Sequence, residues 1–284
     1  MKRIFLTGYY GFHNTGDEAI LTSIIHDLRA LDPTLQITAT SAEPEITAAT
    51  HNVQAIRWSD TLAMVSAVRM ADLVIVGGGG IFHDYWGFDP NAFLTDNHWG
   101  IAFYTAPAVL ASLYGKPVML YGIGVGPLLS DHGKRFTKVA ADAAQVITVR
   151  DAGSKDMLEA LGVCPDKIRV TADPVFAFAA VRQLRNEANS GKTVIGVALR
   201  PWEVGVYPSF WGREVARGLD LLLQNEAIRV ELIPFQRLSG SEDDLAIARR
   251  VRDLMVQKER VAVVEHDLSP AELVDRIASC DLLI

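Results

Sequence analysis

The chain has 284 residues, of which 49% are hydrophobic, and it carries a formal net charge of −7. This length and apolar content allow one large or two ordinary domains with substantial cores. The acidic balance argues against a basic binding surface, so no nucleic acid partner is expected.

The cysteines and the lengths of the apolar runs indicate the cellular compartment in which the protein is expected. The two cysteines, Cys164 and Cys280, have no metal-ligand spacing and form no disulfide framework, which fits a reducing cytoplasm and predicts no metal site. The apolar run at 4–6 is too short for a signal peptide, and no run is long enough to span a bilayer. We therefore expect a cytoplasmic protein, with any membrane contact peripheral and at the inner face.

From the amino terminus to residue 171, short apolar runs alternate with segments of helical periodicity. The runs predict strands at 3–7, 35–40, 53–56, 73–76, 118–121, 146–149 and 168–171. The periodic segments predict helices at 17–30, 43–50, 61–70, 99–113, 134–144 and 155–161. This alternation is typical of a parallel sheet covered by helices. The aromatic and polar stretch at 85–97 is either a mobile loop over a site or a surface excursion.

A polar, charged stretch at 181–192 indicates an inter-domain linker. A second β-α series follows it, with strands expected at 194–199, 230–233 and 261–264, and helices at 210–224, 243–256 and 270–278. The predicted fold class is therefore α/β, with two Rossmann-like domains at 1–180 and 193–284 that each hold a parallel sheet. Residues 281–284 look like the start of another buried strand, so we expect the sequence to be part of a longer protein.

Glycine-rich loops are expected at the carboxyl ends of the first domain's strands, the edge where open α/β sheets bind ligands. Gly77, Gly78, Gly79 and Gly80 follow an apolar run, and such glycines let a ligand approach backbone N–H groups closely. A phosphate or carboxylate suits bare N–H groups, although the pattern is neither a dinucleotide fingerprint nor a P-loop. The alternative is that these glycines only make a tight strand exit.

The loop at 8–18 has the same position after the first predicted strand. It contains glycines, two tyrosines and Asn14, and its acids Asp17 and Glu18 suit the positive end of the following helix. We interpret it either as a helix start capped by Asn14 or Thr15, or as a substrate loop.

Arg150 follows a predicted strand directly, so its guanidinium could bind a phosphate or carboxylate in bidentate fashion; the alternative is an ion pair with Asp151 or another loop carboxylate. Arg200 has the equivalent place in the second domain, with stacking on Trp202 as its alternative. Gln236 could bond the edge of a ring, or belong to an ordinary strand exit.

Together these motifs resemble the polysaccharide pyruvyl transferase family of the CsaB and WcaK type. The resemblance rests on Gly8-Tyr9-Tyr10-Gly11 with Asn14, Gly16-Asp17-Glu18, the four glycines from Gly77, Tyr121-Gly122-Ile123-Gly124-Val125-Gly126-Pro127, Val149-Arg150-Asp151 with Ser154, Asp173-Pro174 and Arg200. Their order and spacing match along essentially the whole chain.

The resemblance implies two domains arranged as in GT-B glycosyltransferases, with the site in the cleft. It implies transfer of the enolpyruvyl group of phosphoenolpyruvate, as donor substrate and without a cofactor, onto sugar hydroxyls of a cell-wall or exopolysaccharide precursor to form a pyruvate ketal. The acceptor would be a lipid-linked or nucleotide-linked glycan. The sequence leaves the oligomeric state open, with a homo-oligomer as one option.

The family pattern also assigns roles. Arg150 matches the arginine of an Arg-Asp motif thought to bind phosphoenolpyruvate, and Asp17 or Glu18 is our candidate for the base. The expected substrate contacts are Tyr10, Asn14, Gly78, Gly79, Gly80, Gly124, Arg200 and Gln236. Family members continue into an Arg-Leu-His motif with the general acid, which would lie beyond Ile284, so we expect residues 1–284 alone to be poorly active or inactive.

Two other functions fit the same sequence. One is a sugar-nucleotide-dependent glycosyltransferase of the GT-B architecture. The other is a non-catalytic ligand-binding protein whose natural end is Ile284.

Overall fold

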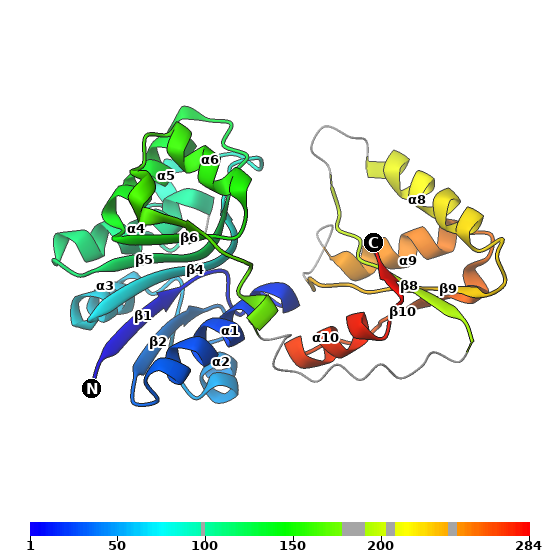
Figure 1. The fold of residues 1–284 in the computed structure, drawn as a ribbon, viewed down its shortest axis with the longest axis horizontal. Helices are drawn as coiled ribbons and strands as arrows, with labels where there is room; N and C mark the ends of the chain where they lie inside the picture. Colours follow the sequence, from blue (N-terminus) through cyan, green and yellow to red (C-terminus); the bar gives the residue numbers. More distant parts are fainter. Residues whose placement is uncertain (98–99, 178–190, 203–207, 238–242) are drawn as a thin grey trace. The chain divides into compact units, whose positions relative to one another are not determined.

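The first unit of the fold is built on a seven-stranded sheet in the order β3-β2-β1-β4-β5-β6-β7, in which all neighbouring strands are parallel (Figure 1). The computed structural model describes residues 1–97, 100–177, 191–202, 208–237 and 243–284. The strands are β1 Arg3–Thr7, β2 Gln36–Ser41, β3 Gln54–Arg57, β4 Leu73–Phe82, β5 Val118–Val125, β6 Val146–Val149 and β7 Ile168–Val170. The predicted parallel α/β sheet is therefore confirmed.

Helices cover both faces of this sheet. They are α1 Thr15–Leu31, α2 Pro44–His51, α3 Thr61–Met70, α4 Gly100–Leu113, α5 Asp131–Ala143 and α6 Ala152–Ala160. Alternate side chains of β1 enter different cores, because successive strand residues point to opposite faces. Phe5 joins the core that α3, α4, α5 and α6 complete, whereas Ile4 and Leu6 join the core completed by α1.

Strand β4 does not end before its glycines. Its pairing with β5 continues as Gly77↔Tyr121, Gly79↔Ile123 and Phe82↔Val125, with an irregularity between Gly79 and Phe82. The glycines therefore lie inside an extended, bulged strand, and the prediction that they follow its end is wrong. Gly78 and Gly79 have φ values of +73° and +77°, a backbone region that glycine adopts without strain.

The second unit holds a four-stranded parallel sheet in the order β10-β9-β8-β11. Its elements are β8 Thr193–Val197, α8 Pro208–Leu222, β9 Ile228–Leu232, α9 Asp244–Leu254, β10 Val261–Val263, α10 Pro270–Ala278 and β11 Leu282–Leu283. β11 is the predicted last strand, and it pairs with β8 in parallel. Leu282 and Leu283 are 53% and 40% exposed, since only β8 pairs with them.

The chain divides into Met1–Phe12 with Asp17–Phe178, and His13–Gly16 with Ala179–Ile284. The sequence placed the domain end nearby, at residue 180, but it did not anticipate that His13–Gly16 would group with the second unit. Most of the linker predicted at 181–192 lies outside the described residues. Among the helices that the structure describes, none combines the length and the hydropathy that a bilayer-spanning segment needs.

Side-chain hydrogen bonds mark several helix starts, including the one predicted at Asn14. The side chain of Asn14 accepts a hydrogen bond from the Gly16 N–H at 3.0 Å at the start of α1. Asp151 caps α6, and Ser269 caps α10 in a reciprocal capping box. Local side-chain bonds therefore fix where these helices begin.

Candidate functional site

Arg150 is the central charged residue of the candidate site in the first unit. It follows β6 directly, and its backbone N–H donates to the Ile123 carbonyl of β5 at 3.2 Å. Its Nη1 lies 3.3 Å from Oδ2 of Asp173, and its Nε lies 4.0 Å from Oδ2 of Asp151. The ion-pair alternative raised from the sequence is thus present, but 38% of the arginine side chain remains exposed.

Two of the predicted glycines make room for this guanidinium. A Cβ atom on Gly80 of β4 would lie 3.3 Å from Nη2 of Arg150, and one on Gly124 of β5 would lie 2.9 Å from its Nε. Larger residues at these positions would compete with the arginine for space. The structure therefore brings the glycines of β4, the glycines of β5 and Arg150 together at the carboxyl ends of three neighbouring strands.

The carboxylates beside Arg150 are themselves anchored. Asp151 accepts hydrogen bonds from the Ser154 backbone N–H at 2.7 Å and from its hydroxyl at 3.0 Å, and the Ser154 oxygen accepts from the Val125 N–H at 2.9 Å. Asp173 accepts from the Val175 N–H at 3.1 Å. Both acids can therefore orient the guanidinium, which leaves its exposed side able to bind an anion.

The first loop reaches the same glycines. A Cβ atom on Gly79 would lie 2.8 Å from Oδ1 of Asp17, so that carboxylate lies against β4. Glu18 accepts a hydrogen bond from the Gly11 N–H at 2.6 Å. Asp17 is thereby placed beside the glycine strand, whereas Glu18 holds the loop in shape.

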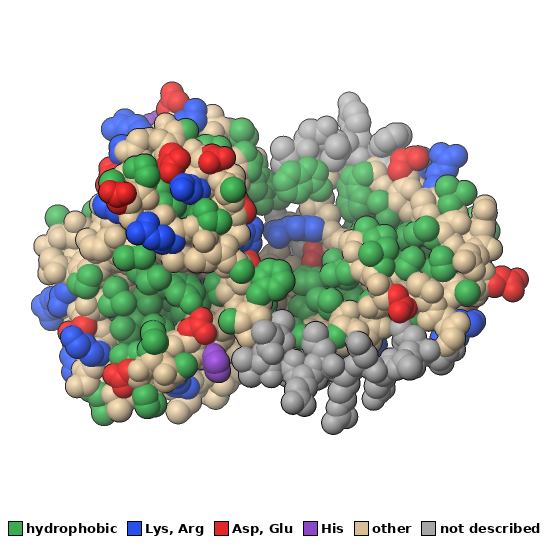
Figure 2. Space-filling model, in the orientation of Figure 1, with side chains coloured by type: hydrophobic (Ala, Val, Ile, Leu, Met, Phe, Trp, Pro, Cys, Tyr) green, Lys and Arg blue, Asp and Glu red, His purple; other side chains and the backbone are tan. Residues whose placement is uncertain are grey.

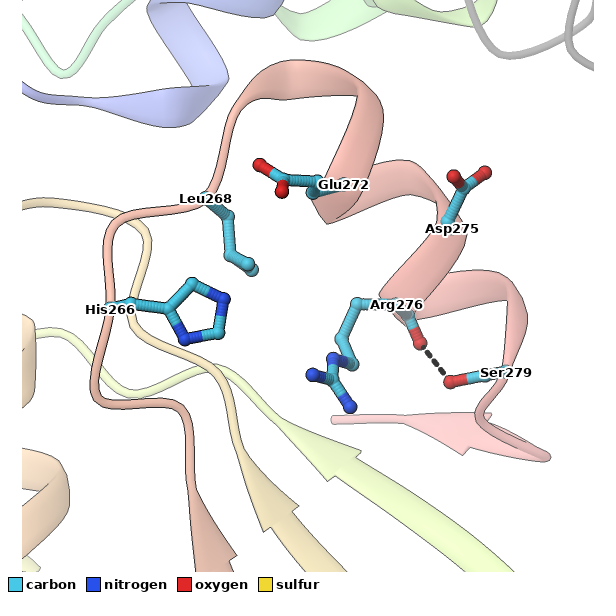
Figure 3. A pocket seen from close by; sticks show the side chains of 6 residues that line it. All are labelled: His266, Leu268, Glu272, Asp275, Arg276 and Ser279. Atoms are coloured by element: carbon cyan, nitrogen blue, oxygen red, sulfur yellow. Dashed lines mark hydrogen bonds between the residues drawn. The ribbon is translucent and has the colours of Figure 1, made fainter.

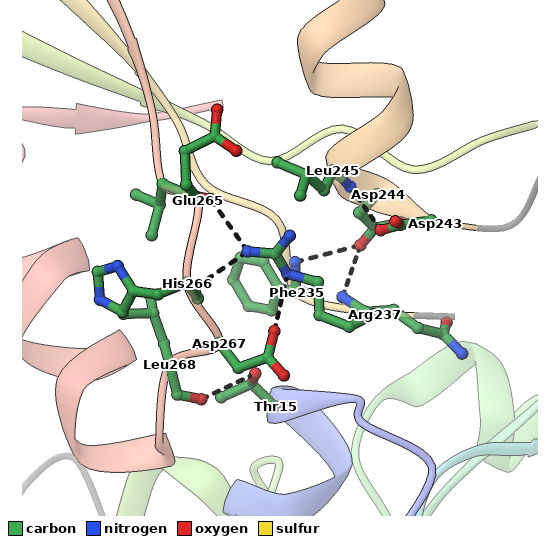
Figure 4. Close-up of polar contacts among 12 residues, drawn as sticks. Thr15, Phe235, Arg237, Asp243, Asp244, Leu245, Glu265, His266, Asp267 and Leu268 are labelled. Carbon is green, nitrogen blue, oxygen red and sulfur yellow. Dashed lines mark hydrogen bonds and ion pairs between the residues drawn. The ribbon is translucent and has the colours of Figure 1, made fainter. Parts of the chain in front are cut away.

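In the second unit, backbone hydrogen bonds fix the segment His13–Gly16 (Figure 4). The Thr15 N–H donates to the Phe235 carbonyl at 2.9 Å, and the Thr15 hydroxyl donates to the Leu268 carbonyl at 3.2 Å. Asn14 and Gln236 form an isolated antiparallel bridge. These contacts explain why the segment groups with residues more than 200 positions away.

Arg237 and Asp244 organise the same region (Figure 4). Arg237 donates to the carbonyls of Val264 and His266, each at 3.0 Å, and pairs with Asp267 at 3.3 Å. Asp244 accepts from the Gln236 N–H at 2.8 Å. Burial raises the pKa of Asp244, and the hydrogen bonds from the N–H groups of Gln236 and Phe235 oppose that shift.

A pocket of about 300 Å³ lies beside α10 in the second unit (Figure 3). It is lined by His266, Leu268, Glu272, Asp275, Arg276 and Ser279. Arg276 pairs with Glu231 at 3.1 Å, and Glu272 serves the capping box of α10. The pocket contains none of the residues predicted to bind substrate. Within the described ranges, no group of three His, Cys, Asp or Glu residues could hold a metal ion.

Charges on the face of the first unit seen in Figure 2 are mixed over α5 and α6. Lys138 of α5 pairs with Asp142 at 3.0 Å, and Lys155 of α6 pairs with Glu159 at 3.6 Å. Local pairing of this kind does not favour a polyanion on this part of the surface.

The family model of the polysaccharide pyruvyl transferases matches residues 14–284. The chain belongs to this family. The sequence is 22% identical over 240 residues to the amylovoran biosynthesis protein AmsJ of Erwinia amylovora, a match that covers 76% of this chain and 52% of that protein. The chain thus spans about half the length of this curated relative.

Solved structures share the fold of this family member. The UDP-GlcNAc 2-epimerase of Neisseria meningitidis bound to UDP-GlcNAc has a TM-score of 0.62 at 13% identity, covering 100% of this chain and 76% of that one. The MnaA–UDP structure of S. aureus has a TM-score of 0.65 at 10% identity, and the match covers 100% of this chain and 73% of that one. HepE of Anabaena in complex with UDP has a TM-score of 0.61 at 14% identity, and the match covers 100% of this chain and 73% of that one. These likenesses confirm the predicted GT-B-like architecture.

Two of the residues expected to contact substrate in this pyruvyl transferase family member, Tyr10 and Gln236, are buried within the described structure. Tyr10 is 1% exposed, and its hydroxyl donates to the Gly77 carbonyl at 2.8 Å, so it is a core residue that braces β4. Burial, followed by the charges of Asp17 and Glu18, raises its pKa well above the usual value. Gln236 is 3% exposed, which removes its amide from a ligand surface. Arg200 is exposed, but it belongs to the second unit, whereas Arg150 and the glycines belong to the first.

Sequence reasoning missed the roles of Asp84 and Asp244. Asp84 is 4% exposed and accepts from the N–H groups of Leu129 and Ser130 at 2.5 and 2.8 Å. Asp84 lies two residues after the end of β4, and an acidic residue in that position is the sequence feature from which its role could have been predicted. The sequence holds no comparable signal for Asp244, because an acidic residue at the start of a helix is already explained by its favourable interaction with the helix dipole.

Proposed function

We propose that the protein transfers the enolpyruvyl group of phosphoenolpyruvate onto hydroxyls of a cell-wall or exopolysaccharide precursor, forming a pyruvate ketal. The observation that carries the proposal is the Arg150 guanidinium, set against Gly80 and Gly124 in a chain of this family. The reaction would take place in the cytoplasm, at the inner face of the membrane where the acceptor is lipid-linked.

The donor explains the composition of the site. Phosphoenolpyruvate carries a phosphate and a carboxylate, and the chain as a whole has a net charge of −7, so the donor needs a local cation. Arg150 supplies that cation in a form suited to bidentate contact with either anionic group. Its position is fixed by Asp173, which reduces the entropy lost when the anion binds.

The chemistry then needs an acid and a base. A proton added to the methylene carbon of phosphoenolpyruvate makes the enol carbon electrophilic, and a sugar hydroxyl adds to that carbon while its proton passes to the base. A second hydroxyl of the same sugar then adds to that carbon as inorganic phosphate departs with the bonding electrons, and the proton of this hydroxyl passes to the departing phosphate. We assign the base to Asp17, since Glu18 accepts from Gly11. The general acid is assigned to the family's Arg-Leu-His motif, which residues 1–284 do not contain.

The test uses the longest reading frame that contains residues 1–284, with phosphoenolpyruvate and a panel of glycan acceptors. We expect phosphate release matched by a gain of one pyruvate ketal in the product mass. Arg150→Lys should lower kcat/KM at least about a hundredfold, because the bidentate contact is lost. Arg135→Lys, on the exposed side of α5, is the matched control. Absence of phosphate release with every acceptor would count against the proposal.

A sugar-nucleotide glycosyltransferase is the second candidate. It is favoured by the solved structures of similar fold, several of which hold UDP or a UDP-sugar. Competition binding separates the two functions. Tight UDP binding together with no phosphoenolpyruvate binding would establish the second candidate over the first.

A further inference from the structure

A turn at residues 84–87 follows β4 in the first unit. The Gly87 N–H donates to the Asp84 carbonyl at 2.9 Å, and Gly87 has a φ of +104°. The two central positions of the turn are Tyr85 and Trp86. Polar and small residues dominate such positions in most surface turns, so two large aromatic residues there are unusual.

Hydrogen bonds between Asp84 and the segment that follows β5 fix the position of the turn. The Asp84 N–H donates to the Pro127 carbonyl at 3.1 Å, and its carboxylate accepts from the Ser130 hydroxyl at 2.5 Å and from two backbone N–H groups. A Cβ atom on Gly133 of α5 would lie 2.3 Å from Oδ2 of Asp84, so glycine there leaves space for the carboxylate. Anchoring of the turn through Asp84 therefore does not depend on the aromatic side chains.

Three aromatic rings pack against one another at this turn. The Tyr85 ring stacks on His83 with centroids 3.9 Å apart and an interplanar angle of 14°. The Trp86 ring lies 5.0 Å from that of Tyr85, and Trp86 is 39% exposed. We call these three residues, His83, Tyr85 and Trp86, the aromatic platform. The rings of His83 and Tyr85 are stacked, and the Trp86 ring packs against Tyr85 at an interplanar angle of 56°, so little conformational entropy is lost when a ligand packs on them.

We propose that the aromatic platform binds the acceptor, with the C–H face of a hexopyranose ring lying on the exposed ring of Trp86 and with Tyr85 beside it. The polarised C–H groups of a sugar ring carry partial positive charge, and the face of an aromatic ring carries partial negative charge. This inference rests on the proposed function, because it names the site for the sugar that accepts the pyruvyl group.

The position of the platform supports a role in the same reaction. Gly80, where an added Cβ would lie 3.3 Å from Nη2 of Arg150, precedes Tyr85 by five residues, and five residues of extended chain reach at most about 18 Å. Arg150 and the platform therefore lie at the same end of β4, within the span of a short oligosaccharide. A sugar held on the platform would be near a donor held by Arg150.

Saturation-transfer NMR without phosphoenolpyruvate tests the inference directly. The probes are the methyl pyranosides of galactose, glucose and mannose, added to the full-length protein. We expect at least one to receive saturation through its ring protons and to shift the indole N–H signal of Trp86, identified as the signal lost in Trp86→Phe. Trp86→Ala and Tyr85→Ala should weaken binding about tenfold, and Trp86→Phe should retain most of it.

Tyr114→Ala is the matched control, because Tyr114 is also an exposed aromatic residue, at 41%, but follows α4 and precedes β5. The inference fails if no pyranoside shifts the Trp86 signal, if Trp86→Ala binds as the wild type does, or if only phospholipid vesicles shift that signal. Sugar binding by the platform without phosphate release in the transfer assay would instead overturn the proposed function and leave the sugar site standing.

Discussion

Arg150 and Asp173 are joined by an ion pair in which Nη1 lies 3.3 Å from Oδ2. The Asp173 side chain is 18% exposed and its other oxygen accepts from the Val175 N–H, so this acid cannot turn away easily. The pair therefore fixes the direction of the guanidinium. It does so without burying the arginine, which suits a residue that must also bind a ligand.

Asp173→Asn should raise the KM for phosphoenolpyruvate by about threefold to tenfold, with a much smaller effect on kcat, because the arginine loses its orienting charge. A partly exposed ion pair contributes little to folding, so the free energy of unfolding should change by less than about 1 kcal/mol. Steady-state kinetics and urea unfolding measure the two effects. Asp166→Asn, at an exposed position before β7, is the control. An unchanged KM would mean that Asp173 does not position Arg150.

Gly124→Ala tests whether the space beside Arg150 matters. The added Cβ would meet Nε, Nη2 and Cζ of Arg150 at 2.9, 3.0 and 3.1 Å, and a flexible side chain can move away from it. We therefore expect a loss of transfer activity of about tenfold or more with a change in stability below about 1 kcal/mol. Phosphate release and thermal unfolding give both values.

Gly218→Ala provides the comparison for that variant. Gly218 lies in α8, where an added Cβ has no atom within 4 Å, so alanine should stabilise the helix by about 0.5–1 kcal/mol and leave activity unchanged. If Gly124→Ala were as active as Gly218→Ala, the space beside the guanidinium would have no functional role.

The gathering of Arg150 and the glycines could be predicted from the sequence because it depends on β-α order. Once the strands are parallel, their carboxyl ends share one edge, and residues that follow different strands become neighbours. The burial of Tyr10 could not be predicted in this way. A Cβ on Gly8 would lie 2.4 Å from Cζ of Tyr10, so the tyrosine fills space that two glycines, Gly8 and Gly77, leave open.

The structure differs from the sequence-based prediction in two further places, and in both the cause is a contact with residues far away in the sequence. Strand β4 continues through its glycines because β5, some 40 residues later in the sequence, pairs with them as far as Phe82. His13–Gly16 joins the second unit through bonds to Phe235, Arg237 and Leu268. The sequence pattern around β4 does not indicate its pairing with β5, and the pattern around residues 13–16 does not indicate contacts with the second unit. The helix starts, by contrast, depend on side chains within three residues, and most were predicted closely, although α5 and α6 each begin three residues before the predicted position.

Asp84→Asn tests the anchor of the aromatic platform. Although burial opposes it, hydrogen bonds from Ser130 and Leu129 keep the pKa of Asp84 below its usual value. An asparagine cannot accept all of these bonds, so the variant should lose about 1–3 kcal/mol of stability at pH 7. Urea unfolding at pH 7 measures this loss.

The pH dependence of the same variant has a definite sign. A carboxyl group whose pKa is lower in the folded state stabilises the protein above its unfolded pKa of about 4, and this contribution disappears as the pH falls through the folded value. The difference between wild type and Asp84→Asn should therefore shrink below about pH 4. A constant difference across that range would show that the charge of Asp84 contributes nothing.

Arg237→Met tests the network that holds the second unit together. Only 12% of the Arg237 side chain is exposed, and it donates to two carbonyls besides pairing with Asp267. Methionine keeps much of the volume but leaves the carbonyls of Val264 and His266 without that donor, so we expect a loss of about 2–4 kcal/mol. Arg249→Met is the matched control, since Arg249 and Glu265 form an exposed pair with side chains 52% and 48% exposed. Differential scanning calorimetry should show a clear fall in Tm for the first variant and little change for the second. Equal shifts would mean that the carbonyl contacts of Arg237 add no more than a surface ion pair.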